Sequence, residues 1–295
     1  MRHAVQRAAI EPYLGHSTPE GLVLRGRILV SRPAPEARPD QGRLTNLRQM
    51  AGRFLTRELG GVTVEAPDAG VSAVSDEEGY FSLVLPRREV SPGSARLAVQ
   101  IAGRPESRVD LEAIVTDPRA SFGVISDIDD TMMRTDAYSL PRNLWTTFTS
   151  NSATRIVFPD AVEFVARLHD GRNPVFYVSS SPWNLHDLLA SVFERAGLVR
   201  GPLFLRDLGI DRDRLISGGH GAHKGAAIDA ILAANPGLPF VLIGDTGQHD
   251  AEIYLAAARR HPGRVRRIVL RAPGPGADAE DKRHAAAAAA LGIDV

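Results

Sequence analysis

The sequence predicts two domains, a small all-β domain of the sandwich type followed by an α/β domain built on a parallel sheet. Residues 21–117 contain short β-rich runs separated by Gly, Pro, Asp and Ser turns, which is the pattern of an all-β domain. Residues 118–272 instead alternate uninterrupted apolar runs with helical patterns, as buried parallel strands and their crossover helices do. A chain of 295 residues is long enough for both domains.

In the all-β part, residues 1–20 are assigned to an N-terminal tail. The runs after it that we expect to be strands are GLVLRGRILV, GVTVEA, GYFSLVLP, ARLAVQIAG and SRVDLEAIV. Residues 43–59 interrupt these runs with apolar side chains at helical spacing, so we expect one helix or an ordered loop there.

The α/β part contains five apolar runs that fit buried strands: FGVIS (122–126), PVFYVS (174–179), PLFLR (202–206), PFVLI (239–243) and RRIVL (266–270). Between them, residues 185–193 and 228–232 each carry one apolar helical face, so we expect helices to return the chain across the sheet. Five such strands form a Rossmann-like sheet. Residues 273–295 are rich in alanine and are expected to form a peripheral helix or a tail.

Composition excludes several classes of function. The 35 basic and 35 acidic residues balance, so no overall charge attracts nucleic acid or a charged membrane surface. The absence of cysteine excludes disulfides, thiol nucleophiles and thiolate metal sites. No apolar run approaches the ~18 residues of a membrane span, and the N-terminus has no secretory signal, so we expect a cytoplasmic protein.

The first expected strand of the α/β part ends in SDIDDT, and ligands of doubly wound sheets bind beyond the carboxyl ends of the strands. Asp127 and Asp129 are two residues apart in an extended segment, so their side chains point the same way. Their repulsion raises the pKa of each carboxyl unless a cation or a proton intervenes, and a hard divalent cation suits such oxygen ligands. For an isolated pair of this kind, a helix cap or a turn is an equally good interpretation.

Two further strand ends carry polar residues. Ser179 and Ser180 end the second strand, where hydroxyl and backbone N–H groups are available to a phosphate. Asp245 follows the fourth strand in IGDTGQHD, and Asp250 comes shortly after it. A serine at such a position is more often a helix N-cap, and either aspartate alone would be uninformative, so the interpretation depends on the whole set.

Only two of the 35 basic residues are lysines, Lys224 and Lys282. Lys224 lies in HGAHKGAAI, at the start of the helix before the fourth strand, where a cation opposes the helix dipole. A compact ammonium that reaches a phosphoryl oxygen and an aspartate together is not well replaced by the planar guanidinium of arginine. We therefore interpret Lys224 as a phosphate ligand, and the alternative is a surface lysine placed by chance.

Taken in order, DxDxT, a strand-end serine, a lysine and GDxxxxD resemble the signature motifs of the haloacid dehalogenase superfamily over residues 122–271. The resemblance implies that Asp127 is the nucleophile and Asp129 the acid and base. It implies that the phosphate ligands are Thr131, Ser179, Ser180 and Lys224. It further implies a magnesium ion, Mg²⁺, whose site is formed by Asp127, Asp245 and the backbone carbonyl of Asp129, with Asp250 in support.

The residues that flank these motifs resemble one particular family within this superfamily. SDIDDT, YVSSSPWNLHDLL and IGDTGQHDAEIY are similar to the catalytic domain of the actin-patch-associated phosphatidate phosphatase family, whose bacterial members also carry a β-rich N-terminal segment. The resemblance implies removal of phosphate from phosphatidic acid, or from a related lipid phosphate, to give diacylglycerol. The sequence departs from the family at Thr246, where GDSGQ would have serine, and this change keeps a hydroxyl.

The stretch between Thr131 and the second strand is short, and residues 160–169 within it fit the ordinary crossover helix. Little remains for a cap, so we expect a minimal cap and an open site, which suits a lipid head group in a bilayer or a macromolecular phosphate. The apolar residues of SLPRNLWTTF, Leu140 to Phe148, fit either contact with lipid or packing in the core.

Two alternatives stay open. The same site would serve a phosphatase that acts on a nucleic-acid end or on a phosphoprotein, although neutral charge and few aromatic residues count against nucleic acid. A non-catalytic phospho-binding module is the alternative from another class, and Asp129 argues against it because a site that only binds needs no acid there. We therefore expect a phosphorylated lipid as the partner, with room for peripheral contact with a membrane; the sequence does not predict the oligomeric state.

Overall fold

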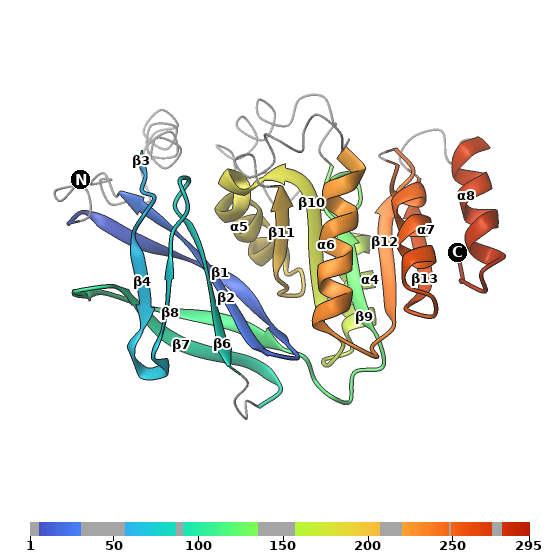
Figure 1. The fold of residues 1–295 in the computed structure, drawn as a ribbon. Helices are drawn as coiled ribbons and strands as arrows, with labels where there is room; N and C mark the ends of the chain where they lie inside the picture. Colours follow the sequence, from blue (N-terminus) through green and yellow to red (C-terminus); the bar gives the residue numbers. More distant parts are fainter. Residues whose placement is uncertain are drawn as a thin grey trace. The chain divides into compact units, whose positions relative to one another are not determined.

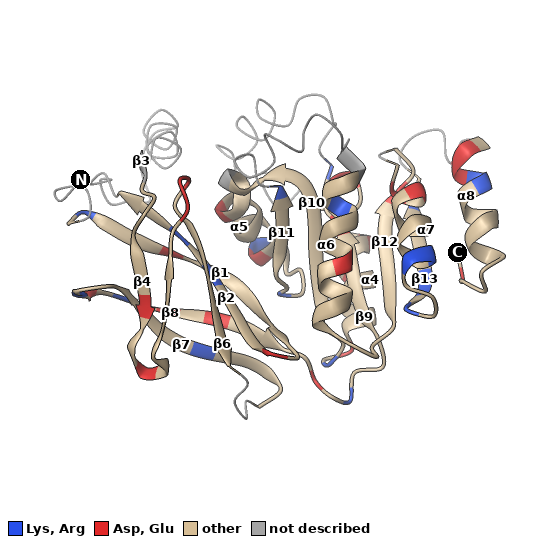
Figure 2. Cartoon of the chain, viewed as in Figure 1, with Lys and Arg blue, Asp and Glu red and all other residues tan. Residues whose placement is uncertain are grey.

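The computed structural model describes residues 6–30, 57–86, 91–134, 157–206, 220–247, 249–272 and 279–295. Contacts within the chain divide it into two compact units, Met1–Val115 and Thr116–Val295 (Figure 1). Basic and acidic residues are interspersed over both units (Figure 2). The helix or loop expected at residues 43–59 lies outside the described residues up to residue 56, and so do the minimal cap and the apolar residues 140–148.

The first unit is all-β, as predicted, but it holds one curled sheet instead of a two-layered sandwich. Its eight strands follow the order β3-β2-β1-β8-β7-β4-β5, with β6 paired to β2. The curl brings β5 close to β6, so the sheet nearly closes into a barrel. The strands are β1 (Ala8–Thr18), β2 (Gly21–Val30), β3 (Arg57–Glu58), β4 (Thr63–Ala66), β5 (Val71–Val74), β6 (Tyr80–Pro86), β7 (Gly93–Ile101) and β8 (Arg104–Val115).

The core of this unit is a cluster of apolar side chains from alternate positions of the strands. In β6 every second residue is buried, namely Phe81, Leu83 and Leu85, and these side chains pack with Leu24 and Ile28 of β2. This alternation is the reason that the sequence showed the strand so clearly, since one face of the sheet is apolar and the other is wet.

Strand β1 corrects the assignment of residues 1–20 to a tail. It pairs antiparallel with β2 along its whole length and parallel with β8 at Gly15 and His16. The run AAIEPYLGHST is only weakly apolar and contains Pro12, whose missing N–H is unfavourable inside a sheet. Pro12 lies opposite Gly26 of β2 and outside the stretch of β1 that pairs with β8.

The second unit is an α/β fold with a parallel sheet, as predicted. The strand order is β11-β10-β9-β12-β13, and every strand pair is parallel. The strands are β9 (Gly123–Asp127), β10 (Val175–Pro182), β11 (Leu203–Arg206), β12 (Phe240–Asp245) and β13 (Val265–Arg271). The helices are α4 (Pro159–His169), α5 (His186–Ala196), α6 (His220–Ala234), α7 (Asp250–Arg260) and α8 (Ala279–Ala289).

Different helices cover the two faces of the parallel sheet (Figure 1). Ile125 and Phe176 belong to the apolar cluster that α6 and α7 complete. Their neighbours along the strands, Val124 and Tyr177, belong to the cluster that α4 and α5 complete. Because both faces are buried, the strands are apolar at successive positions, which explains the uninterrupted apolar runs in the sequence.

The C-terminal segment forms a helix and then returns to the sheet. Of the two outcomes expected for this segment, residues 279–289 adopt the helix, α8, with Ala288 buried. After it, Ile293 is buried and the carbonyl of Asp294 accepts a hydrogen bond from Ile268 N of β13 at 2.8 Å. The end of the described chain therefore covers part of the free edge of β13.

Candidate functional site

The candidate site lies where the order of the parallel sheet reverses direction. Strands β9 and β12 are neighbours, and from each of them the chain continues to the outer strands on its own side. Ligands of doubly wound sheets bind in the crevice at this switch point, beyond the carboxyl ends of the strands. The two strands end at Asp127 and Asp245, so the topology alone brings these two carboxylates together.

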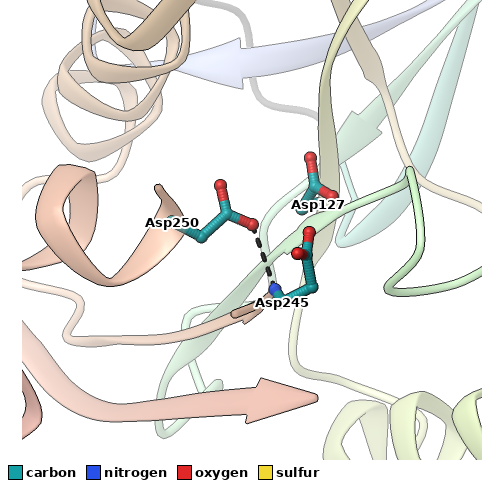
Figure 3. Close-up of side chains that lie close together, drawn as sticks. All are labelled: Asp127, Asp245 and Asp250. Atoms are coloured by element: carbon teal, nitrogen blue, oxygen red, sulfur yellow. Dashed lines mark hydrogen bonds between the residues drawn. The ribbon is translucent and has the colours of Figure 1, made fainter. Parts of the chain in front are cut away.

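Three aspartates gather at this point (Figure 3). Asp127, Asp245 and Asp250 each offer a carboxylate oxygen, and these oxygens lie within 4.8 Å of one another. Asp250 is the first residue of α7, and its Oδ2 accepts a hydrogen bond from Asp245 N at 3.1 Å. Asp245 Oδ1 in turn accepts a hydrogen bond from Gly247 N. The cluster is therefore fixed by the backbone at the end of β12.

Two features of β12 and α7 let these side chains approach. Gly244 has no side chain, and a Cβ atom there would clash with Asp250 Oδ2. Tyr254, one turn into α7, is fully buried and donates a hydrogen bond from its hydroxyl to Ile243 O at 2.8 Å. The tyrosine thus anchors the first turn of α7, and with it Asp250, to strand β12.

Lys224 of α6 is the cation of this cluster. Its Nζ lies 2.6 Å from Asp127 Oδ1 and 2.7 Å from Asp250 Oδ1, and only 3% of its surface is exposed. The unusual position of a lysine in the first turns of a helix has its explanation here, because two buried carboxylates outweigh the unfavourable helix dipole.

Burial changes the acidity of these groups. It raises the pKa of Asp127 well above its ordinary value, with a further rise from the negative charge of Asp250, while Lys224 opposes both effects. Burial, followed by the charge of Asp250, raises the pKa of Asp245 to about 7. Burial alone would lower the pKa of Lys224, but Asp127 and Asp250 raise it above its ordinary value. Lys224 therefore stays protonated at neutral pH.

Asp129 lies in a tight turn that follows β9. Asp130 has a left-handed backbone with φ of 55°, and its N–H donates to Met133 O at 2.8 Å. Asp129 Oδ2 accepts a hydrogen bond of 2.6 Å from the hydroxyl of Ser179 on β10. Burial raises the pKa of Asp129, whereas the hydrogen bond from Ser179 lowers it.

The remaining residues singled out in the sequence differ in their placement. Thr131 is buried in the same turn as Asp129, and its hydroxyl has no hydrogen-bond partner in the described part of the chain. Ser180 is half-buried, and no hydrogen bond among the described residues links it to Asp127 or Asp129. Ser181 was not singled out, yet its side chain and its backbone N–H both face the Ser179 and Asp129 pair.

The donor set suits a hard divalent cation. Asp127 Oδ2 and Asp245 Oδ2 are buried, and neither has a hydrogen-bond partner among the described residues. A buried carboxylate oxygen without a partner costs stability, and carboxylate oxygens are the preferred ligands of Mg²⁺ and Ca²⁺. Both oxygens of Asp250 already accept hydrogen bonds, from Lys224 Nζ and from Asp245 N. Asp250 therefore supports the site, and within this cluster of three aspartates the acceptor atoms without a hydrogen bond belong to Asp127 and Asp245.

Comparison with known proteins identifies a family that matches the α/β unit. Residues 122–272 match the family model "Phosphatidate phosphatase APP1, catalytic domain". The chain is 31% identical over 151 residues to Phosphatidate phosphatase APP1 of Saccharomyces cerevisiae, an alignment that covers 51% of this chain and 26% of that protein. It is 27% identical over 213 residues to an uncharacterized protein of Schizosaccharomyces pombe, covering 69% of this chain and 34% of that protein.

These matches differ in extent. The chain spans about a quarter to a third of the length of these two relatives. The match to the Schizosaccharomyces pombe protein covers more of the chain than the unit Thr116–Val295 contains, so it extends into the all-β unit.

Proposed function

The chain belongs to the family of phosphatidate phosphatase APP1 catalytic domains, and on this premise we propose that it is a Mg²⁺-dependent phosphatase that dephosphorylates phosphatidic acid or a related lipid phosphate through an aspartyl-phosphate on Asp127. The observation that carries the proposal is the ammonium of Lys224, held between Asp127 and Asp250 beside the carboxylate of Asp245. The cluster combines a carboxylate nucleophile with positive charge that can bring a phosphate dianion to it.

We also assign the α/β unit to the haloacid dehalogenase type. The support is the order of the motifs along a parallel sheet: DxDxT follows β9, the serine ends β10, and GDxxxxD runs from β12 into α7. Lys224 enters the same cluster from α6. Each motif residue lies where ligands of such sheets bind.

In the first half-reaction, a carboxylate oxygen of Asp127 forms a bond to phosphorus and the bond from phosphorus to the lipid oxygen breaks. Asp129 gives its proton to that oxygen, so the lipid leaves as an alcohol, which is diacylglycerol when the substrate is phosphatidic acid. Lys224 offsets the negative charge of the phosphoryl oxygens. The buried hydroxyl of Thr131 can donate its hydrogen to one of them, because no described residue accepts it.

In the second half-reaction, a water molecule gives a proton to Asp129 and its oxygen bonds to phosphorus. The bond between phosphorus and Asp127 breaks, and inorganic phosphate leaves. These steps restore the Asp127 carboxylate and the protonated Asp129. The environment of Asp129 suits both directions of transfer, since burial raises its pKa and the hydrogen bond from Ser179 lowers it.

A bound Mg²⁺ would supply positive charge that reduces the repulsion between the Asp127 carboxylate and the phosphate. Asp127 and Asp245 would hold it through their oxygens that lack partners, together with the backbone carbonyl of Asp129. Asp250 would hold Lys224 and the backbone of Asp245 in place.

The lipid substrate is supported by the family and by the Saccharomyces cerevisiae relative, which is named a phosphatidate phosphatase. Its phosphate lies at the surface of a bilayer, so we propose a cytoplasmic protein that contacts the membrane peripherally. In the parts of the chain that the structure describes, no helix has the length and hydropathy of a membrane span.

The test is phosphate release from phosphatidic acid in detergent micelles and from a soluble aryl phosphate, with Mg²⁺ and with a chelator. We expect the wild type to hydrolyse the lipid only with Mg²⁺. Asp127→Asn should lower turnover by at least about 10³-fold, because removing a covalent nucleophile leaves only the residual catalysis of the site. The matched control is Asp170→Asn, a change of the same chemistry at an exposed ion pair with Arg172.

The possible outcomes test the lipid substrate, the enzymatic activity and the aspartyl-phosphate separately. Hydrolysis of the aryl phosphate alone would keep the phosphatase and reject the lipid substrate. Turnover of neither compound, by a wild type that melts cooperatively, would reject the enzyme and favour a phospho-binding module. Equal turnover by Asp127→Asn and the wild type would reject the aspartyl-phosphate.

A further inference from the structure

The carboxyl edge of the parallel sheet carries a tryptophan and an arginine on neighbouring strands. Strand β10 ends at Pro182, which pairs with Arg206, the last residue of β11. Trp183 follows Pro182 directly and begins a short helical turn that leads into α5. The arrowheads of both strands lie at one edge of the sheet (Figure 1), and Asp127 ends the parallel strand β9 at the same edge. Trp183 and Arg206 therefore lie at the edge where a ligand of such a sheet binds.

The register of the sheet places Arg206 beyond the level of Asp127. Val178 of β10 pairs with both Asp127 and Phe204, so these two residues lie at the same level. Arg206 is two residues farther along β11, about 7 Å nearer the edge. Side chains two apart in a strand share a face, and Phe204 belongs to the apolar cluster that α6 and α7 complete. Arg206 thus shares the face from which Lys224 of α6 reaches Asp127.

A second arginine adds positive charge to this edge. Arg134 follows the tight turn after β9 and is exposed, whereas Arg206 is half-buried. Both guanidinium groups are charged at any physiological pH. Within the described ranges, no hydrogen bond or ion pair joins either arginine to another residue, whereas Arg271 at the end of β13 is paired with Asp160. The chain has no net charge, so any attraction of anions by these arginines is local.

The apolar part of the edge consists of Trp183 and Leu185. Both are half-buried and pack against the apolar cluster that α4 and α5 complete. Trp183 also stacks on His186, with ring centroids 5.7 Å apart and an angle of 18° between the ring planes. This packing fixes the indole beside the strand ends and leaves part of it in contact with solvent. A partly exposed tryptophan together with arginine is typical of surfaces that lie among lipid head groups.

We propose that Arg134, Trp183, Leu185 and Arg206, here called the docking rim, bind the surface of an anionic bilayer. The proposal rests on the proposed function and names the membrane contact of that same site. The arginines pair with the phosphates of anionic head groups, those of the substrate and of other lipids alike. Trp183 and Leu185 bury their exposed surface among the head groups. Because the rim borders the site, a lipid phosphate reaches Asp127 while its acyl chains stay in the bilayer.

Vesicle binding tests the charged part of the docking rim. The full chain is sedimented, in a chelator, with vesicles of phosphatidylcholine alone or with added phosphatidylglycerol, an anionic lipid that carries no phosphate monoester. We expect the wild type to bind the anionic vesicles at least about tenfold more tightly than the neutral ones. Arg134→Gln and Arg206→Gln should each lose roughly fivefold, the effect of one basic residue near an anionic surface.

Two further variants control for position and sign of charge. Arg266→Gln removes an arginine at the opposite edge of the sheet, where it lies 5.5 Å from the ring centre of Phe122. Its binding to anionic vesicles should equal that of the wild type. Asp187→Asn removes an acid in the first turn of α5 whose side chain is 55% exposed. This variant should bind the anionic vesicles more tightly than the wild type, because it removes repulsion from the rim.

Tryptophan fluorescence tests the apolar part of the rim. The chain has two tryptophans, Trp145 and Trp183, so Trp145→Phe leaves Trp183 as the only indole. We expect its emission to shift to the blue on anionic vesicles and to be quenched by lipids with brominated acyl chains. The matched control combines Trp145→Phe and Trp183→Phe with Phe122→Trp, which moves the only indole to the opposite edge of the sheet. Its emission should not respond to the vesicles.

Hydrolysis connects the docking rim with catalysis. The quantity to compare is the ratio of turnover on phosphatidic acid in anionic vesicles, at subsaturating lipid, to turnover on a soluble aryl phosphate, both with Mg²⁺. Arg206→Gln should lower this ratio roughly fivefold, because only the lipid requires contact with the bilayer. Arg266→Gln should leave the ratio as it is in the wild type.

Vesicle binding that is equally tight in the wild type, Arg134→Gln and Arg206→Gln would overturn the proposal. Emission of Trp183 that does not change on bound vesicles would also overturn it. If such a protein still hydrolysed phosphatidic acid, the proposed function would stand and another surface would meet the bilayer. Conversely, binding that depends on the docking rim, in a protein that hydrolyses no phosphate ester, would support the rim and refute the proposed function.

Discussion

At Gly244 the backbone of β12 passes directly beside the side chain of Asp250. A Cβ atom would clash with Asp250 Oδ2 and would come within 2.8 Å of the Tyr254 ring. We expect Gly244→Ala to push Asp250 away from Lys224, lowering phosphatase turnover by at least about tenfold, since small misplacements of catalytic groups are costly. Steady-state assays and Mg²⁺ titration of the variant test this.

Gly225→Ala is the matched control, because Gly225 neighbours Lys224 in α6 and its added Cβ atom would meet only Arg260 Nη2 at 3.4 Å. The control should keep its activity and gain up to about 1 kcal/mol of stability, since alanine favours a helix over glycine. Full activity in Gly244→Ala would show that Asp250 does not need its present position.

His16 is a buried titratable residue of the first unit. Burial, and to a lesser extent the charge of Arg25, lowers its pKa from 6.5 to about 3. The folded protein therefore binds this proton more weakly than the unfolded chain. The stability that neutral His16 contributes is complete above pH 6.5 and is lost as the pH falls towards 3, at about 1.4 kcal/mol per pH unit.

We expect His16→Gln to flatten this dependence. Urea unfolding at pH 6.5 and pH 5.0 should show the wild type losing about 2 kcal/mol more than the variant between these two values. The comparison cancels the other titrating groups, which both proteins share. Parallel losses in the two proteins would mean that His16 is protonated in the folded state.

At the residue scale the sequence was informative wherever a polar residue directly followed an apolar strand. Asp127 and Asp245 end adjacent parallel strands, so their meeting follows from the order of the sheet. Lys224 was singled out because lysine is rare in this chain. Ser181 was missed because its approach to Asp129 accompanies the irregularity after Val178, which no periodicity in the sequence reveals.

Among the structural elements, the C-terminal segment after α8 protects an edge of the parallel sheet. Ile293 packs in the same apolar cluster as Ala288 and Ile268, and Asp294 O accepts a hydrogen bond from Ile268 N at 2.8 Å. Removing residues 293–295 should destabilise the protein by about 2–4 kcal/mol through the lost isoleucine and should promote association through the bare edge. Urea unfolding and light scattering measure the two effects.

Asp294→Ala in the full chain is the control for this truncation. It removes the side-chain contact with Arg267 at 2.9 Å, a largely exposed ion pair, and retains the backbone hydrogen bonds. Such exposed pairs contribute about 0–1 kcal/mol, so the control should remain monodisperse. A truncated protein that matches this control would show that the edge needs no cover.

Strands whose two faces are both buried were predicted most accurately. All five parallel strands were predicted to within a few residues, because strands buried on both faces leave uninterrupted apolar runs. Strand β1 was missed because it is short of apolar residues and contains Pro12, and its place in the sheet comes from pairing with β2 and β8. The single curled sheet was not predicted, since alternation reveals which face of a strand is buried but not which strands are neighbours.

At the scale of the whole molecule, the site concentrates charge that the fold would be more stable without. Burial raises the pKa of all four aspartates, Asp127, Asp129, Asp245 and Asp250, so ionising them in the folded protein costs free energy. Lys224 compensates only part of this charge. Such destabilised sites are common where function requires charge in the interior, and a bound cation is the expected remedy.

This balance predicts opposite effects of one substitution with and without metal. Asp245→Asn keeps the size of the side chain and the acceptor for Gly247 N, and it removes one buried negative charge. Without Mg²⁺ we expect the variant to be about 0.5–2 kcal/mol more stable than the wild type, as is usual when a strained functional site is relieved. With Mg²⁺ at 100 times its Kd, the wild type should gain about 2.7 kcal/mol and the variant almost nothing. Calorimetric melting curves of both proteins, each with Mg²⁺ and with a chelator, make the comparison, and Asp170→Asn should behave as the wild type in both. If Mg²⁺ raised the melting temperature of Asp245→Asn as much as that of the wild type, the cation would bind elsewhere and Asp245 would not be its ligand.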